Sequence, residues 1–137
     1  MFTGLIEEKG KILSAKITNT GKQLTISAKQ QFINEIKIGD SIAINGVCLT
    51  ATKIQGTTFQ TDVMQETLKK TTLNNLSHNQ NVNLELAITL NTRLGGHIVQ
   101  GHIDTIGQII QIVNLTTHKE FYISFPLEYS KYLATTG

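Results

Sequence analysis

The sequence contains one cysteine, Cys48, among its 137 residues. A disulfide within the chain is therefore excluded, and a reducing cytoplasm is the simplest compartment to predict. The net charge is +2, and lysine and glutamate are scattered without a basic stripe interleaved with aromatic residues. The chain also lacks an apolar run near the roughly 20 residues of a membrane span, and its N-terminus lacks the pattern of a signal peptide. We therefore expect neither nucleic acid nor a membrane as a partner.

The segment Gly39–Thr52 predicts a β-hairpin around which the rest of the chain is organised. Small and apolar residues alternate before Asn45-Gly46, a pair that supplies the two positive φ angles of a tight type I′ turn. On the return strand, Cys48 and Thr50 share one face. The other face holds Val47, Leu49 and Ala51. The only thiol of the chain therefore lies beside a hydroxyl, just past a sharp turn.

The rest of the first 90 or so residues reads as short strands separated by polar turns, typical of an all-β barrel. Beside the two hairpin strands, we expect strands around Ile12–Leu13 and at Gln23–Ala28, Thr57–Met64 and Asn81–Ile88. In the last of these, alternation predicts that Val82, Leu84, Leu86 and Ile88 face one way. Short helices are expected at Lys29–Ile36 and Gln65–Leu73. The prediction is a six-stranded antiparallel Greek-key barrel with short helices.

The sequence repeats itself at an offset of 97 residues. The matched pairs are Gly4 with Gly101, Ile6 with Ile103, Gly10 with Gly107 and Ile12 with Ile109. The second copy stops before any counterpart of the central hairpin. We therefore expect a complete barrel repeat at residues 1–97, an incomplete second copy at residues 98–137, and a chain that is truncated. An exposed apolar face of the first barrel would then favour a homodimer.

Four segments carry a resemblance to a known family: MFTGLIE, NGVCLT, DVMQETL and GGHIVQGHID. With the repeat, they make the chain similar to riboflavin synthase of the α type along its whole length. The resemblance implies that two molecules of 6,7-dimethyl-8-ribityllumazine react by four-carbon transfer, giving riboflavin and 5-amino-6-ribitylaminouracil, without metal or added cofactor. It implies a trimer for the full-length protein. The same fold occurs in lumazine protein, so a non-catalytic lumazine- or flavin-binding protein is the alternative.

The resemblance also implies which residues form the site. His102 is the candidate base for the acidic 7-methyl group, Cys48 a candidate nucleophile, and Ser41 a candidate proton-relay partner. The predicted pocket consists of Phe2, Gly4, Leu5, Ile6, Cys48, Leu49, Thr50, Asp62, Val63, Met64, Gln65, Glu66, Thr67, Gly101, His102 and Ile103.

Each catalytic candidate also has a purely structural interpretation. Cys48 could be a small buried apolar side chain or a contact to the ligand ring. Ser41 could be a hydroxyl on a strand face, and His102 an ordinary surface imidazole. A metal pair of His97 with His102 is not expected, because a spacing of five residues shares no helical face and a third ligand is missing nearby.

Overall fold

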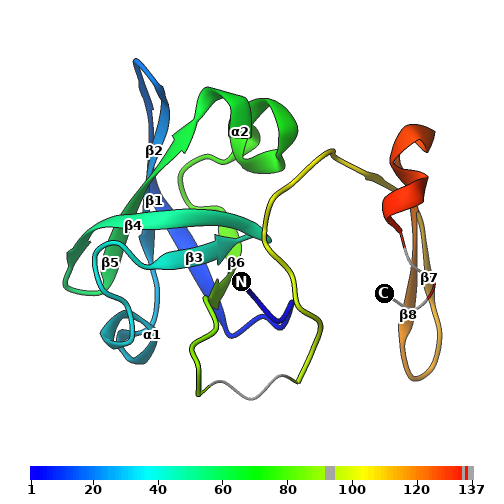
Figure 1. The fold of residues 1–137 in the computed structure, drawn as a ribbon, viewed down its shortest axis with the longest axis horizontal. Helices are drawn as coiled ribbons and strands as arrows, with labels where there is room; N and C mark the ends of the chain where they lie inside the picture. Colours follow the sequence, from blue (N-terminus) through cyan, green and yellow to red (C-terminus); the bar gives the residue numbers. More distant parts are fainter. Residues whose placement is uncertain (92–94, 134, 136–137) are drawn as a thin grey trace. The chain divides into compact units, whose positions relative to one another are not determined.

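The computed structural model describes residues 1–91, 95–133 and 135. Their contacts divide the chain into two compact units, Met1–Ile103, called here the barrel unit, and Asp104–Gly137, called the hairpin unit. The barrel unit contains a closed antiparallel barrel with the strand order β1-β2-β5-β4-β3-β6 (Figure 1). The strands are β1 Glu8–Thr18, β2 Gly21–Ser27, β3 Ser41–Ile44, β4 Val47–Gln55, β5 Thr58–Met64 and β6 Asn81–Leu86. The predicted six-stranded barrel is confirmed.

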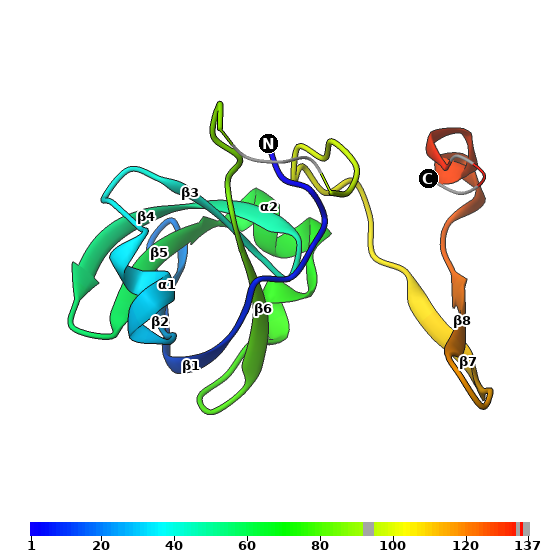
Figure 2. The same cartoon turned by 90° about the horizontal axis from the view of Figure 1, so that it is seen from below.

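The connections give the barrel its Greek-key order. Strands β3, β4 and β5 follow one another as neighbours, whereas β2 pairs with β5 and the chain then crosses to β3 through the short helix α1, Gln30–Asn34 (Figure 2). Phe32 and Ile33 of α1 join the apolar core, as their helical spacing predicts. Strand β6 follows a second helical connection and closes the barrel between β3 and β1.

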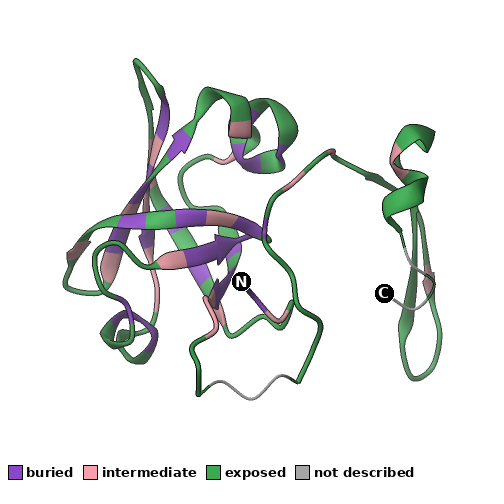
Figure 3. Ribbon diagram, viewed as in Figure 1, coloured by how far each residue is buried: buried purple, intermediate pink, exposed green. Residues whose placement is uncertain are grey.

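The central hairpin has the predicted turn and the predicted faces. Asn45 and Gly46 have φ angles of 49° and 83°, as a type I′ turn requires. Along β4, Cys48 is half-buried and Thr50 is exposed, and their neighbours face the core (Figure 3). The core-facing neighbours are Val47, Leu49 and Ala51. The hairpin therefore presents Cys48 at the surface of a packed barrel.

Several predicted elements have different bounds in the structure, and two of these differences have a clear physical cause. Strand β6 ends at Leu86 rather than at Ile88, because the backbone amide of Ile88 donates instead to the carbonyl of Met1, 2.9 Å away. The predicted helix 65–73 is divided into α2, Gln65–Lys70, and the 3₁₀ turn η1, Thr72–Asn75. Thr71 between them is extended, and its hydroxyl donates to the Thr67 carbonyl and accepts from the Leu73 amide.

The hairpin unit consists of β7 Gln108–Asn114, β8 Lys119–Ser124 and the 3₁₀ helix η2 Leu127–Tyr132. The contacts place its division from the barrel unit after Ile103. The reason is that Val99 pairs with Phe2, and the Gly101 carbonyl accepts a hydrogen bond from the Cys48 amide. Among the residues described in both units, none of the helices combines the length and the apolar character needed to cross a membrane.

Thr61 gives a test of the barrel core. It is 1% exposed, and among the described residues its hydroxyl has no hydrogen-bond partner. Because an unpaired buried hydroxyl is destabilising, we expect Thr61→Val to raise the free energy of unfolding by about 1 kcal/mol. The matched control is Thr71→Val, which removes a buried hydroxyl with two partners and should lower stability. Denaturant unfolding of both variants checks this, and a loss of stability at residue 61 would contradict it.

Candidate functional site

A cavity of about 200 Å³ adjoins the turn end of β4 and is called here the Cys48 cavity. It brings together six of the residues predicted from the sequence, from three separate segments. Its lining consists of Val47, Cys48, Glu66, Thr67, Lys70, Thr71, Gly101, His102 and Ile103. A thiol, a threonine hydroxyl, an imidazole and a carboxylate therefore line one concave surface of the barrel unit.

A close approach of two backbones joins the Gly101 segment to β4. The Cys48 amide donates to the Gly101 carbonyl at 3.0 Å, and Gly101 has a φ of +78°. A Cβ built on Gly101 would lie 2.9 Å from Cys48 Cβ and 3.1 Å from Phe2 Cε2. Only glycine fits this space and this backbone conformation without strain. The position of His102 in the cavity wall therefore depends on the absence of a side chain at residue 101.

Two oppositely charged side chains line the side of the Cys48 cavity that α2 forms. Glu66 and Lys70 lie one turn apart on α2, and Lys70 Nζ lies 3.2 Å from Glu66 Oε1. Hydrogen bonding and charge from Lys70, with a further contribution from Lys69, hold the pKa of Glu66 below its ordinary value. Glu66 is thus an anionic acceptor and Lys70 a cationic donor at the cavity, a combination suited to the hydroxyl groups of a polyol.

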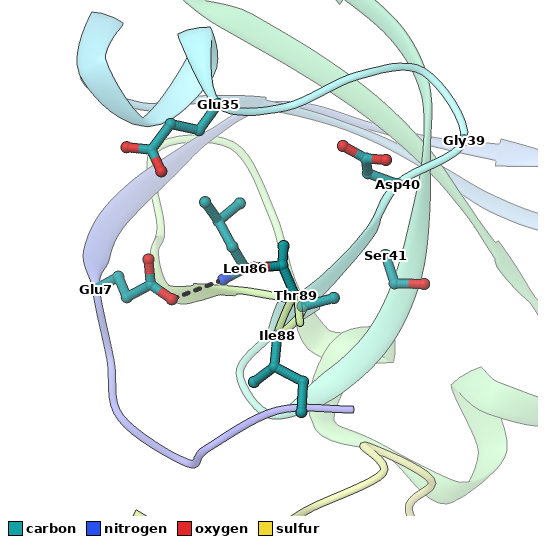
Figure 4. A pocket seen from close by; sticks show the side chains of 9 residues that line it. Glu7, Glu35, Gly39, Asp40, Ser41, Leu86, Ile88 and Thr89 are labelled. Carbon is teal, nitrogen blue, oxygen red and sulfur yellow. Dashed lines mark hydrogen bonds between the residues drawn. The ribbon is translucent and has the colours of Figure 1, made fainter. Parts of the chain in front are cut away.

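Some predicted residues lie elsewhere. Gly4 and Ile6 line a second cavity of about 460 Å³, together with Glu85 and residues of the hairpin turn. Ser41 lines a third cavity, of about 440 Å³, beside Glu7, Glu35 and Asp40 (Figure 4). The structure therefore brings Cys48 and His102 together at one cavity. Ser41 borders the third cavity, but it also pairs with Thr50 across β3 and β4, on the face of the hairpin that carries Cys48.

The remaining predicted residues line none of these three cavities as described. Phe2, Leu49 and Val63 are buried, with exposed fractions of 2%, 8% and 1%. The exposed members are Leu5, Thr50, Asp62, Met64 and Gln65. The buried side chains pack inside the barrel unit, and the exposed ones lie at its surface.

Sequence reasoning missed three residues of the Cys48 cavity and, among other residues of the second cavity, one buried carboxylate. Val47, Lys70 and Thr71 line the Cys48 cavity, and Glu85 lines the second one. Lys70 follows Glu66 by one helical turn, and this spacing could have indicated its place. Nothing local marks Glu85, because its partners Thr3 and Gly4 are distant in the sequence.

Glu7, at the Ser41-lined cavity, gives a prediction for pH. Burial raises the pKa of its carboxyl, the Leu86 amide donating at 3.1 Å opposes this, and the carboxylates of Glu85 and Glu35 raise the pKa further (Figure 4). A raised pKa in the folded state means stability that is present below the ordinary value of 4.5 and lost as pH rises through the folded value.

We therefore expect the stability of the parent relative to Glu7→Gln to fall as pH rises above about 4.5. The glutamine keeps a carbonyl oxygen for the Leu86 amide but does not titrate. Denaturant unfolding of the parent and of Glu7→Gln, at pH values below and above about 4.5, measures the difference in stability between them. A difference that does not change with pH would contradict the prediction.

Comparison with known proteins identifies relatives of the whole chain. The lumazine binding domain family matches residues 3–87. Riboflavin synthase of Bacillus amyloliquefaciens is 42% identical over 100% of this chain and 63% of its own length. The riboflavin synthase of Mycobacterium bovis is 38% identical, over 100% of this chain and 68% of its own length. The chain thus spans about three fifths to two thirds of these relatives.

Solved structures share the fold. A crystal structure of LumP complexed with riboflavin superposes with a TM-score of 0.85 at 23% identity, covering 96% of this chain and 71% of that chain. A structure of LumP complexed with flavin mononucleotide gives a TM-score of 0.81 at 25% identity, covering 92% of this chain and 70% of that one.

Proposed function

Because the chain belongs to the lumazine-binding domain family and is homologous to riboflavin synthases, we propose that it acts in riboflavin synthesis. The reaction is the dismutation of two 6,7-dimethyl-8-ribityllumazine molecules by four-carbon transfer, without metal or added cofactor. The observation that carries this proposal is the cavity in which Cys48, Thr67 and His102 meet. The proposed compartment is the cytoplasm.

The residues of the Cys48 cavity match what the reaction requires. An imidazole is suited to removing a proton from the acidic 7-methyl group, so His102 is the proposed base. Cys48 can add to a ring carbon or contact the ring. Glu66 and Thr67 offer an acceptor and a hydroxyl to the ribityl chain. Ser41 lies in another cavity, so a proton relay from it to Cys48 would need a rearrangement or an intervening group.

The size of the cavity indicates that one chain supplies only part of the site. Its volume of about 200 Å³ is below the roughly 300–1,000 Å³ of typical small-molecule sites. This small volume favours a second surface that covers a bound ring system, and the reaction also needs a second lumazine. We propose that another subunit supplies that surface, in a trimer for the full-length protein or a dimer for a shorter chain.

Local geometry in the two units supports the proposed repeat. Strand β1 has a register shift between Ile12 and Ser14, and β7 has one between Ile109 and Gln111. The second shift lies 97 residues after the first, at the offset of the sequence repeat. A Cβ on Gly10 would lie 2.9 Å from Ile26 Cγ2, and one on Gly107 would lie 2.7 Å from Ile123 Cγ2. The same bulge and the same close approach therefore occur at equivalent positions. This favours the hairpin unit as the start of a second lumazine-binding repeat.

Ligand titration tests the binding part of the proposal. We expect the folded chain at micromolar concentration to change the fluorescence of riboflavin on binding, because the ring exchanges contact with water for contact with protein side chains. Folding is checked first by circular dichroism. Lumazine titrated in a parallel series should compete with riboflavin for the same site. A folded sample that leaves the fluorescence of both ligands unchanged at high micromolar protein would contradict the proposal.

The alternative function is binding without turnover. The specific observation in its favour is that the chain shares its fold with crystal structures of LumP complexed with 6,7-dimethyl-8-(1'-D-ribityl) lumazine and with riboflavin. A product assay with 6,7-dimethyl-8-ribityllumazine separates the two functions. Formation of riboflavin supports the enzyme, and tight binding without product supports the alternative.

A further inference from the structure

Glu85 is a buried carboxylate that binds the N-terminal strap, defined here as Met1–Gly4. It is 7% exposed, and its Oε1 accepts hydrogen bonds from the Thr3 amide at 2.5 Å and the Thr3 hydroxyl at 2.7 Å. The Gly4 amide donates to the two carboxylate oxygens at 3.1 and 3.2 Å. An ionised carboxylate only accepts hydrogen bonds, and such charge-assisted bonds are stronger than neutral ones. Both carboxylate oxygens of Glu85 thus accept hydrogen bonds from Thr3 or Gly4 of the strap.

Besides Glu85, the strap also contacts the segment that precedes His102. Phe2 and Val99 exchange two backbone hydrogen bonds, at 2.7 and 2.9 Å, and the His97 amide donates to the Thr3 carbonyl at 3.0 Å. Phe2 is 2% exposed, and its ring edge reaches the space above Gly101. Phe2 and Thr3 of the strap therefore pair with residues 97–99. These lead within three residues to the wall of the Cys48 cavity.

We propose that Glu85 is a positioning residue: by fixing the strap, its carboxylate sets the place of Gly101 and His102 in the Cys48 cavity. The path consists of contacts already described, from Glu85 to Thr3, from Phe2 to Val99, and from Gly101 to Cys48. Glu85 itself does not line that cavity. The consequence for ligand affinity rests on the proposed function, whereas the consequence for the strap does not.

The test is Glu85→Gln, which keeps one acceptor oxygen but turns an NH₂ group toward the donors of the strap. Hydrogen bonds to charged groups contribute roughly 1.5–3 kcal/mol, so amide exchange at Thr3 and Gly4 should rise roughly 10- to 100-fold. The amide signals of Gly101 and His102 should shift in nuclear magnetic resonance spectra, and riboflavin should dissociate more readily. The matched control is Glu35→Gln, at an exposed glutamate that caps the C-terminal end of α1, and it should leave the strap unchanged.

The measurements separate the possible outcomes. Unchanged exchange at Thr3 and Gly4 would overturn the role of Glu85 in holding the strap. Faster exchange with unchanged signals of Gly101 and His102 would show a purely structural role and overturn the positioning role. If the parent does not bind riboflavin, the proposed function fails, while the exchange and the signals still decide the role of Glu85.

A second pair of variants covers the case in which Glu85→Gln does not fold. Thr3→Val removes the hydroxyl that donates to Glu85, whereas Thr3→Ser keeps it. We expect Thr3→Val to speed amide exchange at Gly4 and to shift the amide signals of Gly101 and His102, as Glu85→Gln does. In Thr3→Ser, the exchange and the signals should stay as in the parent protein. Equal behaviour of the two variants would overturn the proposal.

Discussion

Gly101→Ala should destabilise the barrel unit by about 2–5 kcal/mol and abolish ligand binding at the Cys48 cavity. The substitution forces an alanine into a left-handed backbone conformation, which costs roughly 1–2 kcal/mol. Its Cβ would also lie 2.9 Å from Cys48 Cβ and 3.1 Å from the Cys48 amide nitrogen, and such crowding of a packed region costs roughly 1–3 kcal/mol. Relief of the crowding would separate residue 101 from β4 and carry His102 away from Cys48.

Gly56→Ala is the matched control for this prediction. Gly56 also has a positive φ, +57°, but among the described atoms none lies within 4 Å of the Cβ that the substitution adds. It should therefore lose only about 1–2 kcal/mol and keep its affinity for riboflavin. Denaturant unfolding and riboflavin titration of both variants measure the difference. Equal losses at the two glycines would show that the crowding against Cys48 has no effect.

The part of the fold that sequence reasoning predicts well is the part determined by neighbours in the chain. Asn45-Gly46 identifies its turn because few other residue pairs accept two positive φ angles. The two faces of β4 follow from the alternation of side chains along any strand. Once the hairpin is correct, Cys48 must share a face of β4 with Thr50, and on that face the structure shows Cys48 half-buried and Thr50 exposed.

The part that could not be predicted depends on contacts between distant segments. Side chains alternate along β6, so Glu85 lies on the other face of the strand from Leu84 and Leu86. From the sequence pattern alone, that face is predicted to be exposed to solvent. Glu85 is buried because the strap, about 80 residues earlier in the chain, supplies its hydrogen-bond donors. Ser41 is a mixed case. The register of β3 and β4 places it opposite Thr50, on the face that carries Cys48, yet the cavity that it lines is that of Glu7 and Asp40.

His102→Gln should lower the rate of riboflavin formation roughly 10²- to 10⁴-fold, the usual contribution of a general base. Glutamine keeps polar atoms at a comparable position in the wall of the Cys48 cavity but cannot accept the proton of the 7-methyl group. Because a base acts mainly in the transition state, the affinity for the lumazine should change much less than turnover. Initial rates and equilibrium titration, made on the shortest form of the protein that turns over the lumazine, measure the two quantities.

Two further variants make this prediction specific. Cys48→Ser should reduce turnover less than His102→Gln if the thiol contacts the ring, and by a similar factor if it adds to the ring as a nucleophile. His78→Gln changes another exposed histidine, whose Nδ1 lies 2.8 Å from the Leu13 carbonyl, and should leave turnover unchanged. A His102→Gln variant that loses affinity but keeps its turnover at saturating lumazine would assign His102 to binding. In that case, the proton must be removed by another group or by water held in the cavity.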